Sequence, residues 1–162
     1  MVITEENDKK LISYFRAIFD APPNLGQFND RLAIQKIAYF LHAFRITFMD
    51  YHFIWYWRGV YSSLIGTQVY HLIGNTECSS FIPIITQKET MFLNKIKNIL
   101  PDTKEEKLSF LELYTSILFF QKEENVQDST ELMEKIKLHK PWYNEQQIFQ
   151  AINALSKLSF PG

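Results

Sequence analysis

A run of aromatic residues at positions 53–65, with the sequence FIWYWRGVYSSLI, constrains the fold of this chain most. Large rings occupy alternate positions of its first half, at Phe53, Trp55 and Trp57. A period of two in aromatic residues is typical of a strand with one face in a core. Gly59 then interrupts the pattern, and Ser62 or Ser63 can cap a helix that runs through Leu72. We therefore expect a strand, a glycine turn and a helix start, in this order.

Two readings of the aromatic strand follow from its composition. In the first, the three alternating rings face a core while Tyr56 and Arg58 border solvent, because aromatic side chains bury large apolar areas. In the second, the segment lines a recognition groove. Trp and Tyr interleaved with Arg are frequent anchors of protein interfaces, and such side chains also stack on unpaired bases. We favour the first reading for the rings at alternate positions.

Apolar residues recur at helical spacing through most of the remaining chain, and prolines or polar caps separate the runs. Thr86 with Glu89, and Asn144 with Gln147, fit the capping box, in which two side chains satisfy free backbone donors at a helix start. The helices predicted in this way cover Glu6 to Asp20, Asn29 or Asp30 to about Phe44, Ser62 or Ser63 through Leu72, Thr86 through Ile99, a long stretch with Leu111 to Leu118, Asp128 or Ser129 to about Leu138, and a last stretch with Ile148 to Leu158. Phe81 to Ile85 is a candidate second strand.

These elements predict a mainly α protein, a compact helical domain with a small two-stranded β element in its N-terminal half. A chain of 162 residues has the usual size of one domain, so we expect a single domain over 1–162. Residues 1–85 would hold helices and the β element, and 86–162 a helical bundle packed onto them. The lone Cys78, and the lack of a signal-peptide pattern or of an apolar run near the ~20 residues that span a bilayer, favour a cytoplasmic protein without membrane contact.

Residues with catalytic or metal-binding chemistry form no recognisable motif. The spacings of His42, Asp50, His52 and His71 match no metal site, so packing or hydrogen bonding explains them better. Cys78 has no neighbouring base to activate it, and the serines after Gly59 lack the second glycine of a nucleophile elbow. We expect no enzyme, no catalytic or metal residues and no cofactor.

Several short segments together resemble the signature of the uncharacterised YwgA-like family. They are the sequences at 34–37 (IQKI), 39–41 (YFL), Phe53 with Trp55 and Tyr56, 59–62 (GVYS), 111–115 (LELYT), Lys140 and Pro141 with Tyr143, and Ala151 to Leu155. The chain is more distantly similar to SocA and Panacea-type antitoxin domains. The resemblance spans about residues 30–158 and implies a helical domain with a small strand element, but no activity. Val60 stands where the family has proline, a residue that pre-sets a turn.

The functional prediction is a non-enzymatic binding or regulatory module that acts through contacts with another protein. The candidate interaction residues are Arg58, Tyr61, Tyr56, Lys36 and Gln35. The alternative is a nucleic-acid-binding transcriptional regulator of winged-helix-like type, in which the helix with Arg31, Gln35 and Lys36 stands beside the short strands. A net charge of -1 disfavours general attraction to nucleic acid, although residues 29–74 are weakly basic.

Overall fold

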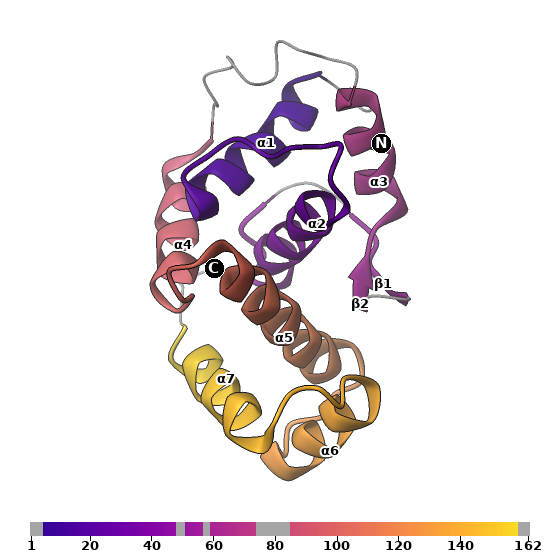
Figure 1. Cartoon of the computed structure of the whole chain (residues 1–162), viewed down its shortest axis with the longest axis vertical. Helices are drawn as coiled ribbons and strands as arrows, with labels where there is room; N and C mark the ends of the chain where they lie inside the picture. The colour runs from indigo at the N-terminus through magenta and orange to yellow at the C-terminus, as the bar shows by residue number, and fades with distance from the viewer. Residues whose placement is uncertain (1–4, 48–50, 57–58, 74–84, 159–162) are drawn as a thin grey trace.

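The computed structural model describes residues 5–47, 51–56, 59–73 and 85–158 (Figure 1). Within these ranges the chain is mainly α with one two-stranded antiparallel sheet, so the predicted fold class is confirmed. The helices are α1 (Glu5–Phe19), α2 (Phe28–Ala43), α3 (Ser63–Leu72), α4 (Gln87–Asn98), α5 (Lys104–Glu123), α6 (Ser129–His139) and α7 (Glu145–Lys157), and the strands are β1 (Ile54–Tyr56) and β2 (Gly59–Tyr61).

Polar side chains define where most of these helices begin. The Thr86 hydroxyl accepts the N–H of Glu89, and the Glu89 carboxylate accepts the N–H of Thr86, which confirms the capping box before α4. Asn144 and Gln147 make the same reciprocal pair before α7. Single side-chain caps come from Ser62 before α3, Thr103 before α5 and Asp128 before α6. Side-chain caps therefore define the starts of α3 to α7.

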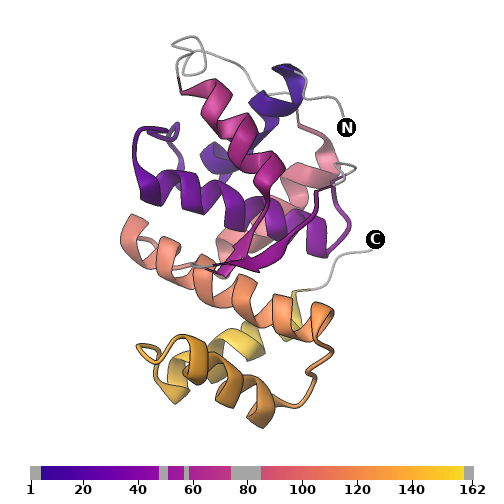
Figure 2. The same ribbon diagram turned by 90° about the vertical axis from the view of Figure 1, so that its right-hand side faces the viewer.

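Helices α2 and α5 form the centre of the molecule and pack against each other. Every residue of α2 from Ala33 to Leu41 is buried, and so is every residue of α5 from Leu113 to Phe120. Burial on all sides is the mark of an interior helix. Helices α1 and α3 contact α2, whereas α6 and α7 contact α5, as the ribbon in Figure 2 shows, where α5 lies between α2 and the C-terminal pair.

The last three helices contact one another, whereas α4 packs on α1. A buried carboxylate joins those two N-terminal elements: Glu89 of α4 accepts a hydrogen bond from the Tyr14 hydroxyl of α1 and lies 3.2 Å from the Lys10 ammonium. Burial by itself raises the pKa of Glu89, but the donors from Tyr14, Thr86 and Lys10 outweigh it and hold that pKa below its ordinary value. The charged form of Glu89 therefore stabilises the α1–α4 contact.

The two strands form a hairpin in which Ile54 pairs with Tyr61, Trp55 with Val60, and Tyr56 with Gly59. The sequence predicted a glycine turn that leads from the first strand into the next helix, but Gly59 instead begins the second strand, which precedes α3. A glycine beside the turn of a hairpin adopts a positive φ without steric cost, and φ is 103° here. Of the other candidate strand, Phe81 to Ile85, residues 81–84 lie outside the described residues.

The described rings of the aromatic segment follow the first of the two readings. Phe53 is buried and meets Tyr39 edge to face at 5.1 Å, and Trp55 is half-buried with its ring 4.8 Å from that of Phe120. Tyr56 is 58% exposed, as predicted. Trp57 and Arg58 lie outside the described residues.

Candidate functional site

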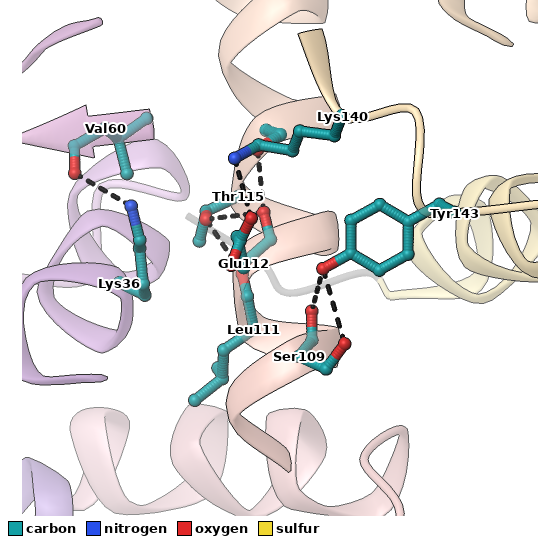
Figure 3. Close-up of polar contacts among 9 residues, drawn as sticks. Lys36, Val60, Ser109, Leu111, Glu112, Thr115, Lys140 and Tyr143 are labelled. Carbon is teal, nitrogen blue, oxygen red and sulfur yellow. Dashed lines mark hydrogen bonds and ion pairs between the residues drawn. The ribbon is translucent and has the colours of Figure 1, made fainter. Parts of the chain in front are cut away.

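Two side chains of α2 hold strand β2 from inside the molecule. The Gln35 amide donates from Nε2 to the Ser62 carbonyl at 3.0 Å, and its Oε1 accepts the Ser62 N–H at 2.9 Å. The ammonium of Lys36, which is 2% exposed, donates to the Val60 carbonyl at 3.1 Å (Figure 3). Buried backbone polar groups require such partners, and a two-stranded sheet cannot supply all of them. Gln35 and Lys36 therefore position β2 and the start of α3.

Gly59 lets the Lys36 ammonium approach the hairpin closely. A Cβ atom built at this glycine would lie 3.0 Å from Lys36 Nζ and 3.8 Å from Lys140 Nζ. Two cationic groups from distant parts of the chain therefore meet at one backbone position. The positive φ of Gly59 adds a second requirement for glycine there.

Lys140, in the connection between α6 and α7, forms an ion pair with Glu112 of α5 at 2.7 Å (Figure 3). Lys140 is 3% exposed, and its ammonium also lies over the rings of Trp55 at 5.5 Å and Trp142 at 5.4 Å. A buried ammonium needs this compensation, because removal from water is costly for a charged group. The ion pair links the connection between α6 and α7 to α5, directly beside the hairpin.

A cavity of about 320 Å³ lies between α2, α5 and the residues before α7, and we call it the α2–α5 cavity. Its lining includes Lys36, Glu112 and Tyr143. The Tyr143 hydroxyl donates to the Ser109 carbonyl at 2.8 Å, and burial raises the pKa of Tyr143 to about 12, so this tyrosine remains a neutral donor at ordinary pH (Figure 3). The charged side chains near this cavity include both signs, and the Glu112 carboxylate is already paired with Lys140.

A larger space of about 410 Å³, the α2–α3 pocket, is lined by residues of α2, β2 and α3. Its lining residues are Phe28, Arg31, Leu32, Gln35, Tyr61, Gly66, Val69, Tyr70 and Ile73. Most of these are apolar, and three of the large ones, Phe28, Tyr70 and Ile73, are exposed to solvent. Tyr70 has the highest exposure of the three, 75%. The pocket is therefore apolar and open.

The position of Tyr61 in the α2–α3 pocket depends on Gly66 of α3. A Cβ atom at Gly66 would overlap with the Tyr61 hydroxyl and would lie 3.3 Å from the ring carbon that bears it. Tyr61 also packs against the exposed ring of Tyr56, with centroids 5.4 Å apart. Glycine at position 66 thus allows the Tyr61 side chain to lie directly on α3 and to form one wall of the pocket.

Arg31 is the only charged residue in the lining of the α2–α3 pocket within the described part of the chain. Its Nη1 donates to the Leu25 carbonyl at 2.9 Å, and its guanidinium carbon lies 5.9 Å from the centre of the Phe28 ring. These contacts fix the side chain at the start of α2. The pocket therefore combines apolar walls with one held positive charge.

The structure separates the described candidate interaction residues among the α2–α3 pocket, the α2–α5 cavity and strand β1. Tyr61 and Gln35 line the α2–α3 pocket, Lys36 lines the α2–α5 cavity, and Tyr56 lies exposed on β1. Arg58 lies outside the described residues. Arg31, Gly66 and Tyr70 were not singled out for the pocket by the sequence, although aromatic and arginine side chains on neighbouring helices are the composition expected of a binding surface.

Two further observations concern the described residues only. They contain no cluster of three or more His, Cys, Asp or Glu side chains placed to hold a metal ion. Their helices are also too short or too polar to cross a bilayer.

Comparisons with known proteins give no relative for this chain: no protein-family model, curated protein or solved structure matches it.

Proposed function

We propose that this protein is a non-enzymatic binding module that contacts another protein through the α2–α3 pocket. The observation that carries the proposal is the apolar pocket of about 410 Å³ with exposed Phe28, Tyr70 and Ile73 around it. Large apolar side chains gathered at an open pocket are characteristic of interaction sites. A side chain of a partner protein would enter the pocket and remove these groups from water.

The residue types around the pocket support a protein partner. Tyr and Arg are enriched among the residues that contribute most binding energy at protein interfaces, and the pocket has Tyr61, Tyr70 and Arg31. The hydrogen bonds from Lys36 to Val60 and from Gln35 to Ser62, on either side of Tyr61, also favour binding, since a wall that is already ordered loses little entropy when a partner binds.

The test is a comparison of matched surface variants. Tyr70→Ala combined with Phe28→Ala should abolish co-purification of a specific partner while the midpoint of thermal unfolding stays nearly unchanged, because both side chains are exposed. Leu138→Ala is the control, since Leu138 is 79% exposed on α6 and lies outside the pocket lining. Equal partner recovery with the double variant and the control would argue against the proposal.

The nucleic-acid alternative has less support from the placement of its residues. It relied on Arg31, Gln35 and Lys36, of which the last two are buried and bonded to the backbone of Ser62 and of Val60. A titration with DNA and RNA at rising salt concentration separates the two functions, because binding through phosphate contacts weakens steeply with salt.

A further inference from the structure

We propose that the α2–α3 pocket recognises a carboxylate next to an apolar side chain, so that its partner presents an acidic, apolar peptide segment. This inference rests on the proposed function and specifies the chemistry of the partner. It depends on three observations among the described residues at one pocket: a single held cation, an available hydroxyl group and apolar walls without an acidic side chain.

The cation is Arg31, whose guanidinium carries five N–H donors. One of them is used by the Leu25 carbonyl, and no acidic side chain among the described residues pairs with Arg31. The acid beside it in sequence, Asp30, is directed elsewhere: it accepts the Asn24 N–H at 2.7 Å and lies 2.9 Å from the Lys104 ammonium. The positive charge of Arg31 is therefore available to a ligand, and carboxylates match the planar donor geometry of arginine.

The second donor is the Tyr61 hydroxyl. Within the described part of the chain it forms no hydrogen bond, although it lies at the Gly66 wall of the pocket. The neighbouring Gln35 amide is occupied by the Ser62 backbone through both of its functional atoms. Arginine and tyrosine thus supply donors, while the described lining contains no carboxylate that would repel an anion.

The apolar part of the ligand would contact Phe28, Val69, Tyr70 and Ile73. A space of about 410 Å³ lies within the ordinary size range of ligand sites and accommodates an aromatic or branched aliphatic side chain with its backbone. Burial of that side chain supplies affinity, while the Arg31 charge selects the acidic neighbour.

Three matched probes test the proposal on the full chain: N-acetylphenylalanine, its neutral amide, and phenylalanine amide, which is cationic. Backbone NMR shifts report binding and its place. We expect the acid to perturb Gly66 and Val69 and to bind about tenfold more tightly than the neutral amide, which corresponds to one charge-assisted hydrogen bond. The cationic amide should bind most weakly, because Arg31 repels it.

Arg31→Gln should remove the preference for the acid and leave binding of the neutral amide unchanged. Arg45→Gln is the control, because it removes the same charge from an exposed position outside the pocket lining. Equal binding of acid and neutral amide to the wild type would overturn the carboxylate specificity while the pocket remains a protein contact. The carboxylate specificity would also be overturned if Arg31→Gln still preferred the acid, or if no probe bound to the wild type. Partner co-purification tests the proposed function separately.

Discussion

The ammonium nitrogen of Lys36 lies 3.0 Å from the point that a Cβ atom on Gly59 would occupy. The Lys36 ammonium can approach the hairpin because Gly59 has no side chain. In return, its hydrogen bond to the Val60 carbonyl stabilises the position of β2. The two residues are 23 positions apart in sequence, yet each one makes the other's conformation possible. The Lys36 contact to Val60 and the Gln35 contact to Ser62 lie on either side of Tyr61 in sequence, and together they position its backbone.

Gly59→Ala should lower the free energy of unfolding by about 2–3 kcal/mol, because a side chain at a φ of 103° is strained and would also displace the Lys36 ammonium. Urea denaturation measures the change. Gly26→Ala is the control, since Gly26 is exposed and has no positive φ. A loss at position 59 no larger than in the control would contradict the argument.

Gly66→Ala should destabilise the protein by about 1–3 kcal/mol and weaken binding at the α2–α3 pocket, because the new methyl group overlaps with the Tyr61 hydroxyl. Tyr61→Phe in the same chain removes that oxygen and should recover part of the lost stability. The four proteins of this double-mutant cycle can be compared by thermal unfolding. If the two substitutions were additive, the steric contact between them would not be the cause.

Lys140→Met should cost about 3 kcal/mol, because Glu112 loses the partner that compensates its partly buried charge. Adding Glu112→Leu should restore much of this loss, since a buried ion pair and an apolar pair of similar size often have similar stability. Chemical denaturation of the single and double variants gives the coupling. Lys137→Met, at the exposed pair with Glu145, is the control and should cost under about 1 kcal/mol. An equal cost at both lysines would show that burial of the Lys140–Glu112 pair does not cause the loss.

The pKa of Glu89 is lowered from 4.5 in the folded protein, which predicts loss of stability in acid. Its contribution is fully present above the unfolded pKa and disappears as the pH falls through the folded pKa, because only the charged carboxylate is favoured by its donors. Glu89→Gln should therefore flatten the decline of the unfolding midpoint below about pH 4.5. The exposed Glu134→Gln should leave that slope unchanged, and identical slopes in all three proteins would exclude Glu89 as the source.

The parts of the fold that depend on local chemistry could be predicted from the sequence. Thr86 with Glu89 and Asn144 with Gln147 are three residues apart, and this spacing in the sequence is enough to predict their reciprocal hydrogen bonds. The second strand could not be recognised in this way. A glycine weakens a strand on propensity alone, and only the pairing of Tyr56 with Gly59 shows that it stands next to a hairpin turn.

The site depends on pairings between distant residues, which a single sequence does not contain. Gln35 and Ser62 are separated by 27 positions, and Glu112 and Lys140 by 28. The sequence drew attention to Tyr61, Gln35 and Lys36, but it could not show that Gln35 bonds the Ser62 backbone and Lys36 the Val60 carbonyl. Polar residues on a helix look the same in sequence whether they face water or a buried backbone.

Because α5 is buried against α2 on one side and against α6 and α7 on another, a break in the chain near residue 85 would not yield two separable halves. The first fragment would expose to water the face of α2 that packs on α5, and the second would expose the face of α5 that packs on α2. Each fragment alone would then associate non-specifically or remain unfolded, whereas the two produced together in one cell should reassemble around their shared helix pair.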